Sequence, residues 1–272
     1  MITVTRRTAV AAVAALALAG GLTACGSSGS KPAAGSSASS ASAAASPKVS
    51  GTVTVFAAAS LQGTFTALGK KFEAANPGTK VIFNFGGSSA LAQSINSGAP
   101  ADVFAAASPA TMKTVTDAKG ATTSTVFVRN TLEIAVPKGN PKHISSLKDL
   151  AGAGLKVALC AKQVPCGAAA VTALNAGGVN LTPVTLEQDV KGALTKVELG
   201  EVDASLVYKT DVQADAAKID GVDFPEAAKA VNDYPIATLT KAPNAAGAAA
   251  FTAYILSPEA GQVLTAAGFQ AP

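Results

Sequence analysis

From residue 53 onward, the chain alternates short apolar runs with segments whose apolar residues recur every three or four positions. The short runs have the length of buried strands, and they lie at residues 53–57, 81–85, 102–106, 156–160, 185–188 and 204–207. The second pattern predicts helices, and the clearest case carries Leu61, Phe65, Leu68 and Phe72 on one face. Alternating strands and helices are typical of an α/β fold.

Two further apolar runs predict how the chain is divided. Residues 129–136 read as a strand that leaves the first βα unit, and residues 234–239 read as a strand that returns to it. We therefore expect lobe 1 to comprise residues 50–129 and 235–272, and lobe 2 to comprise residues 130–234. Each lobe should be a mixed sheet flanked by helices. Two chain crossings would form the hinge, with a ligand cleft between the lobes.

The N-terminus predicts export. Arg6 and Arg7 precede an apolar stretch at residues 8–20, and small residues then lead to Cys25. This is the pattern of a signal peptide over residues 1–24, with a single membrane helix and twin-arginine export as weaker alternatives. The segment from Leu22 to Cys25 resembles the lipobox of bacterial lipoproteins, which implies a lipid on Cys25 and anchoring to the outer face of the membrane.

Composition narrows the class of protein. Residues 25–49 are almost all Ser, Ala and Gly and predict a flexible tether. Hydrophobic residues make up 49% of the chain and charged residues 14%, so the remainder should be globular. The net charge is +4, two of it from Arg6 and Arg7, and no basic run occurs, which argues against nucleic acid as a partner.

Two cysteines, Cys160 and Cys166, remain after Cys25. An even pair in an exported chain suggests a disulfide. A metal site is the alternative, but the spacing is not that of a zinc site, and His143 is isolated in a polar connection.

The candidate chemistry lies where strands run into helices. Ser60 and Ser88 follow the first and second strands, and residues 164–167 and 188–190 precede two later helices. Helix starts offer unpaired N–H groups and a partial positive field, so four of them facing one cleft would suit an anion. Taken singly, each serine could instead cap its helix, and Tyr208 could be a surface aromatic at a strand end.

Six segments of the chain resemble, in the same order, the molybdate-binding lipoproteins of bacterial ABC importers. They are residues 54–61 (TVFAAASL), 85–92 (FGGSSALA), 98–104 (GAPADVF), 164–167 (VPCG), 189–194 (DVKGAL) and 206–208 (LVY). The resemblance implies a type II periplasmic-binding-protein fold and capture of molybdate or tungstate, with no cofactor and with molybdenum held only as molybdate. It also implies delivery to a membrane permease with its ATPase, and we expect a monomer.

The resemblance also implies the ligand set. The N–H and hydroxyl groups of Ser60 and Ser88, the N–H groups of Cys166 and Val190 and the Tyr208 hydroxyl would bind the oxyanion. Cys166 stands where the family usually has Ala, which a backbone donor tolerates. Our hypothesis is that a Cys160–Cys166 disulfide braces this loop.

Some alternatives stay open at this stage. Sulfate or another tetrahedral oxyanion could be the ligand, because the sequence does not reveal cavity size. An exported enzyme is disfavoured because a single His143 supports no Ser-His-Asp set and no Gly-x-Ser-x-Gly motif occurs. A purely structural lipoprotein would bind no anion. We interpret Asp189 as a helix cap, and Asp102 as a strand-start or inter-lobe hydrogen-bonding group.

Overall fold

The computed structural model describes residues 49–272, which fall within one compact unit. The predicted signal peptide (1–24), Cys25 and the tether (25–49) lie outside the described residues, apart from residue 49. No helix in the described part of the chain has the length and apolar content needed to cross a bilayer.

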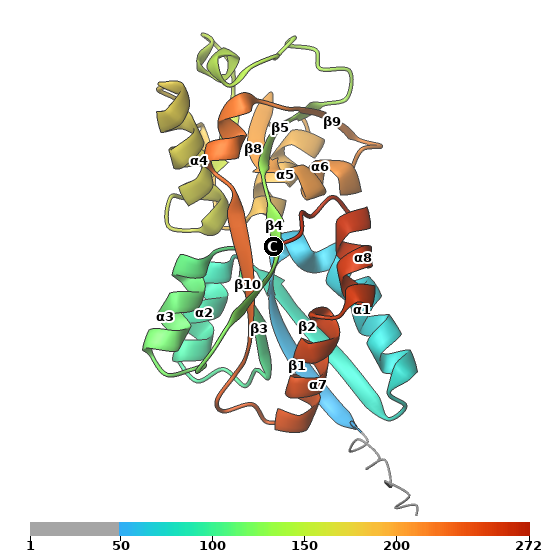
Figure 1. Ribbon diagram of the computed structural model, residues 1–272. Helices are drawn as coiled ribbons and strands as arrows, with labels where there is room; N and C mark the ends of the chain where they lie inside the picture. Colours follow the sequence, from blue (N-terminus) through green and yellow to red (C-terminus); the bar gives the residue numbers. More distant parts are fainter. Residues whose placement is uncertain (1–48) are drawn as a thin grey trace, which may run out of the picture. The chain divides into compact units, whose positions relative to one another are not determined.

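The strands and helices alternate over most of the described chain (Figure 1). The strands are β1 (Gly51–Ala58), β2 (Thr79–Gly86), β3 (Val103–Ala105), β4 (Thr125–Asn130), β5 (Leu132–Pro137), β6 (Val157–Cys160), β7 (Thr185–Glu187), β8 (Ala204–Tyr208), β9 (Ile219–Val222) and β10 (Asn232–Thr238). The α-helices are α1 (Gln62–Ala75), α2 (Ser88–Asn96), α3 (Pro109–Asp117), α4 (Pro165–Gly177), α5 (Val190–Glu198), α6 (Lys209–Ala214), α7 (Ala245–Ile255) and α8 (Pro258–Ala266). Short 3₁₀ helices are η1 (Ala59–Leu61), η2 (Leu147–Ala151) and η3 (Pro225–Lys229).

The strands form two five-stranded sheets of the same design. Sheet A has the order β2-β1-β3-β10-β4, and sheet B has the order β7-β6-β8-β5-β9. In each sheet the first three strands of this order are parallel to one another. The fourth strand, β10 or β5, is antiparallel to both of its neighbours. The predicted fold class, an α/β protein with two mixed sheets flanked by helices, is confirmed.

Apolar residues cover both faces of sheet A. Successive side chains of a strand point to opposite faces, so β1 contributes to both apolar clusters. In β1, Val53 and Val55 face the core that includes Phe65 of α1 and Phe251 of α7. Phe56 faces a second cluster with residues of α2 and α3. A strand buried on both faces explains why β1 reads as a continuous apolar run.

The hinge between the sheets differs from the single strand predicted at residues 129–136. That run is two strands, because β4 ends in sheet A at Asn130 and β5 begins in sheet B at Leu132. The Asn130 side chain accepts a hydrogen bond from the Thr131 N–H (3.0 Å) and donates one to Thr210 (2.8 Å). The Thr131 carbonyl accepts from the Lys209 N–H (2.9 Å), so side-chain and backbone bonds together hold the break.

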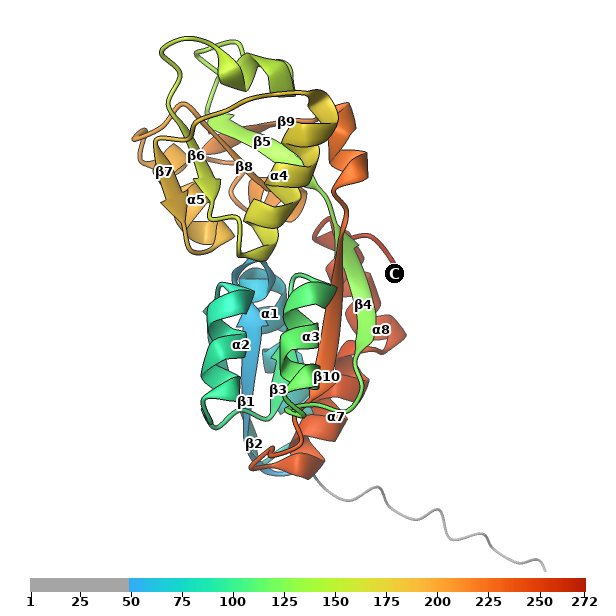
Figure 2. The same cartoon turned by 90° about the vertical axis from the view of Figure 1, so that its left-hand side faces the viewer.

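The second crossing precedes β10. This strand begins at Asn232, where it pairs with Asn130, so residues 232–234 lie in sheet A. Figure 2 shows β4 and β10 running side by side between the two groups of elements. The start of β10 is three residues ahead of the lobe boundary expected between residues 234 and 235.

Helix α6, strand β9 and η3 have no counterpart in the sequence-based prediction. Each is short, at six, four and five residues, and each carries polar or charged positions. Segments this short contain too few positions for a helical or strand periodicity to be recognised.

Candidate functional site

A small cavity of about 20 Å³ lies where the helix starts of both sheets meet. Its lining comes from strand ends and helix N-termini, and includes Ala58, Ala59, Ser60, Gly86, Gly87, Ser88, Ala107, Val164, Pro165, Cys166, Asp189, Val190 and Tyr208. All five residues predicted to bind the oxyanion are in this set. The volume is far below the roughly 300–1,000 Å³ of pockets for organic ligands, so the space fits a compact ion.

The two serines enter the cavity from sheet A. Ser60 lies in η1 directly after β1, and Ser88 is the first residue of α2 directly after β2 and Gly87. Both side chains are buried, at 8% and 2% exposure. The Ser88 Oγ accepts a hydrogen bond from the Ala107 N–H (3.0 Å), and the Ser60 Oγ lies 2.9 Å from the Tyr234 Oη. Neither serine side chain caps its helix, so the capping alternative is wrong for both.

Two helix N-termini enter the cavity from sheet B. Cys166 is the second residue of α4, which begins at Pro165, and Val190 is the first residue of α5. The helix expected to follow residues 164–167 therefore begins within that segment, at Pro165. In the described chain, no carbonyl accepts from the N–H groups of Ser88, Cys166 or Val190. These are the free donors that a helix start leaves.

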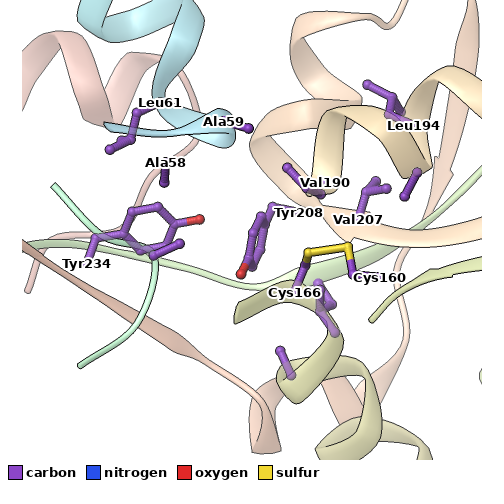
Figure 3. Close-up of a cluster of buried hydrophobic side chains, with 14 of the residues drawn as sticks. Ala58, Ala59, Leu61, Cys160, Cys166, Val190, Leu194, Val207, Tyr208 and Tyr234 are labelled. Carbon is purple, nitrogen blue, oxygen red and sulfur yellow. A yellow bond between two sulfur atoms is a disulfide. The ribbon is translucent and has the colours of Figure 1, made fainter. Parts of the chain in front are cut away.

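The Cys160–Cys166 disulfide is present, as predicted. Cys160 ends β6 and Cys166 lies in the first turn of α4, with their Cα atoms 5.8 Å apart. Figure 3 shows the disulfide close to Tyr208, with Val190 nearby. The bond therefore ties the strand end to the helix start that carries the Cys166 N–H.

Tyr208 ends β8 and is 1% exposed, so the alternative of a surface aromatic is wrong. Its ring packs edge-on against Tyr234, with centroids 5.8 Å apart (Figure 3). Its Oη accepts a hydrogen bond from the Asn232 amide (3.0 Å). Burial, the neighbouring Tyr234 and Asp211 raise the pKa of Tyr208 well above its usual value, so the phenol stays protonated and can donate.

The charged groups at and near the cavity are bonded to partners in the protein. Asp189 is the one charged residue in the lining, and its carboxylate accepts from the Gly192 N–H (2.9 Å) as the predicted cap of α5. Lys191, the second residue of α5, pairs with Asp211 (3.2 Å) and Asp215 (3.3 Å). Among residues 49–272, no Lys or Arg lines the cavity. The donors that face it are neutral.

Asp102 has a structural role inside sheet A and its helices. Its carboxylate accepts from the Thr54 N–H (2.7 Å) and from the Asn244 N–H (2.6 Å) just before α7. These bonds join the start of β3 to β1 and to α7. Of the two predicted roles for Asp102, the strand-start role is therefore correct and the inter-lobe role is wrong.

The two sides of the cavity touch directly. The Ser89 Oγ of α2 donates to the Gln163 carbonyl beside α4 (2.8 Å). A Cβ atom added at Gly87 would overlap the Gln188 carbonyl, next to α5. Only a glycine at position 87 allows this close approach without displacing the chain on the other side.

A larger groove of about 810 Å³ is also lined by Ser60 and runs along α1, α5 and α6. Its charges are already paired, since Lys191 contacts Asp211 and Asp215, and Lys218 lies 3.6 Å from Glu198. The charged side chains that line the groove are therefore not left over to pair with an anion. Within residues 49–272, no three His, Cys, Asp or Glu side chains lie close enough together to hold a metal ion.

Sequence reasoning missed three residues at this site. Ala107 lines the cavity, and Asn232 and Tyr234 of β10 hydrogen-bond to Tyr208 and Ser60. The sequence signal that could have identified Asn232 and Tyr234 is that both lie, two residues apart, at or just before the start of a strand predicted to cross between the lobes. Their partners, however, lie 24 and 174 residues away in the chain.

These features define a class of protein, in which two α/β lobes joined by two strand crossings enclose a small solute between helix N-termini. A model of the bacterial extracellular solute-binding proteins matches residues 53–270, and the chain belongs to that family. The molybdate-binding protein ModA of Mycobacterium tuberculosis is 43% identical over 257 residues, which cover 94% of this chain and 95% of the relative.

Other known proteins agree with this placement. The molybdate-binding protein ModA of Escherichia coli is 31% identical over 80% of this chain and 89% of its own length. The periplasmic molybdate-binding protein of Azotobacter vinelandii has the same fold, with a TM-score of 0.71 over 81% of this chain and 99% of that structure. At 22% identity, this last similarity concerns the fold alone.

Proposed function

We propose that this protein is the extracytoplasmic solute-binding component of an ABC importer, and that it captures molybdate, and also tungstate, between its two lobes. The observation that carries the proposal is the convergence of Ser60, Ser88, Cys166, Val190 and Tyr208 on one cavity of about 20 Å³. The identity with molybdate-binding relatives along nearly the whole chain supports the choice of ligand.

The proposed recognition uses neutral donors. The N–H groups of Ser60, Ser88, Cys166 and Val190 and the three hydroxyls would each donate to an oxygen of the dianion. Hydrogen bonds to a charged acceptor are shorter and stronger than neutral ones, and the N-termini of α2, α4 and α5 add a favourable field. A dianion can thus be held without a lysine or arginine in contact.

The same donors would select against protonated anions. A protonated oxygen, as in hydrogen phosphate, would bring its hydrogen into a site that presents donors and no acceptor. That hydrogen would lose its bond to water and gain none, which costs about 1–3 kcal/mol or more. Molybdate, tungstate and sulfate are fully deprotonated at neutral pH and avoid this cost.

Transport requires capture and release. In the proposed cycle the open protein binds the dianion on one lobe, and closure about the β4 and β10 crossings brings the donors of the other lobe and excludes water. A permease with its ATPase then receives the ion from the closed, monomeric protein. Membership of an extracellular family supports export, and Leu22 to Cys25 supports lipid attachment at Cys25 to the outer face of the membrane.

Thermal melting of the purified protein tests the proposal, with molybdate, tungstate, sulfate and phosphate added separately. A ligand at a hundred times its Kd stabilises by about 2.7 kcal/mol, which for a body of this size raises Tm by roughly 5–10 °C. We expect this rise with molybdate and tungstate. A rise with sulfate alone would replace the ligand but keep the binding-protein function, and no rise with any anion would refute it.

A further inference from the structure

Asn232 is a buried polar residue at the start of β10, in the second crossing between the sheets. Its side-chain amide nitrogen makes two hydrogen bonds: 2.6 Å to the Ala107 carbonyl and 3.0 Å to the Tyr208 Oη. Asn232 therefore joins the segment that follows β3, the crossing strand and the end of β8 at one point beside the cavity.

The Ala107 carbonyl determines which way the Asn232 amide faces. A carbonyl oxygen can only accept, so the group 2.6 Å from it must be the NH₂ and not the side-chain oxygen. The NH₂ has two protons, and the second is directed at the Tyr208 Oη. This bond can have only one direction, with Asn232 donating and Tyr208 accepting.

The direction of that bond leaves the Tyr208 proton free. A phenol has one proton, and because Tyr208 accepts from Asn232, it keeps that proton to donate elsewhere. Tyr208 lines the cavity, so a bound oxyanion is an available acceptor. Ala107 acts in the same way on the other side, since its N–H donates to Ser88 Oγ and leaves the Ser88 proton free.

We propose that Asn232 is a positioning residue for anion capture, which holds the Tyr208 hydroxyl as an acceptor toward the crossing strand and thereby directs its proton into the cavity. This inference rests on the proposed function and adds a residue that does not itself contact the ligand. Ala107 would help to orient both hydroxyls. Its N–H donates directly to the Ser88 Oγ, and its carbonyl holds the Asn232 amide that donates to Tyr208.

A double-mutant cycle with molybdate as the probe tests the inference. Calorimetry on the purified protein would compare Asn232→Leu, Tyr208→Phe and the double variant. We expect Tyr208→Phe to weaken binding by about 5- to 150-fold, as for loss of one buried donor to a charged acceptor, and Asn232→Leu to weaken it by roughly tenfold. In the Tyr208→Phe background, Asn232→Leu should change affinity by no more than about twofold.

The cycle separates positioning from a merely structural role. If Asn232 only supports the fold, Asn232→Leu would weaken binding as much in the Tyr208→Phe background as in the wild-type background, and the two losses would multiply. That result in a protein that binds molybdate would overturn this inference and leave the proposed function intact. An unsubstituted protein that binds no molybdate would overturn both.

Two further variants keep the test decisive. Asn244→Leu is a matched control, because the Asn244 amide nitrogen likewise donates two hydrogen bonds, here to the backbone carbonyls of Ser50 (2.9 Å) and Thr52 (3.0 Å), which are not in the cavity lining. It should lower Tm and leave the molybdate affinity unchanged. If Asn232→Leu does not fold, the smaller Asn232→Ser replaces it in the same cycle, with the same two outcomes.

Discussion

At the scale of single residues, the site depends on which partner each polar group already has. The Ser88 Oγ accepts from Ala107, and the Tyr208 Oη accepts from Asn232. A hydroxyl that accepts from a protein donor has its own proton left for a ligand. The cavity can therefore offer neutral hydrogen-bond donors to a ligand, because the groups packed against these hydroxyls leave the hydroxyl protons free.

This view predicts the effect of removing a serine hydroxyl. Ser60→Ala or Ser88→Ala should weaken molybdate binding by about 1–3 kcal/mol, because an oxygen of the buried anion loses its donor. Isothermal calorimetry would measure the change. Wild-type affinity in both variants would show that the site has been misassigned.

Ser108→Ala is the matched control for these serines. The Ser108 side chain caps α3 by accepting from the Thr111 N–H (3.2 Å), and it is not in the cavity lining. Its loss should cost about 1 kcal/mol of stability and leave the affinity unchanged. The comparison separates a capping serine from a binding serine.

At the scale of elements, the donors belong to helix starts held by short connections to strand ends. The connection from β6 to α4 is constrained in two ways, because the disulfide closes a loop there and Gly167 packs against the Ala161 carbonyl so closely that a Cβ would overlap it. The Cys166 N–H is thus placed by covalent and steric constraints on one short segment.

Reduction of the disulfide should loosen this segment. Closing a loop of this length stabilises a protein by about 2 kcal/mol in the chain-entropy model, so reductant should lower the free energy of unfolding by that amount and weaken molybdate binding. Denaturant titration with and without dithiothreitol would measure the first effect, and calorimetry the second. A Cys160→Ala/Cys166→Ala variant should be insensitive to the reductant. Equal stability and affinity of the reduced and oxidised protein would contradict the bracing role.

At the scale of the whole described body, the proposed binding cycle brings the two lobes together. Gly87, next to α2, and the Gln188 carbonyl, next to α5, meet with no room for a side chain between them. Ser89 and Gln163 add a hydrogen bond beside this contact. Since these contacts join the two lobes, they belong to the closed arrangement.

Gly87→Ala should therefore impair closure and not folding. The added methyl group would keep the lobes apart, so we expect molybdate affinity to fall by roughly tenfold or more. The Tm of the ligand-free protein should change little, because the open form has room for the methyl group. Gly63→Ala on α1 is the control, because a Cβ there meets nothing within 4 Å. Its affinity should equal that of the wild type. Unchanged affinity in Gly87→Ala would show that this contact is not needed for binding.

Much of this protein could be predicted from its sequence, because the relevant signals are local. Apolar runs of strand length, a helical repeat such as Leu61 to Phe72 and a cap such as Asp189 are each encoded within a few residues. The cysteine pair is equally local, with a separation of six residues. These signals, with the six family-like segments, were sufficient for the α/β class, the disulfide and five of the residues that line the cavity.

The tertiary structure alone decided what depends on distant contacts. It divided residues 129–136 between two sheets, placed Asn232 against Tyr208 and Tyr234 against Ser60, and set the cavity volume at about 20 Å³. A hydroxyl becomes a donor or an acceptor according to the group packed against it, and Ser60 and Tyr234 lie 174 residues apart. Local sequence patterns therefore specify the elements and their ends, whereas the direction of each hydrogen bond in the site is set by the way the folded chain brings those ends together.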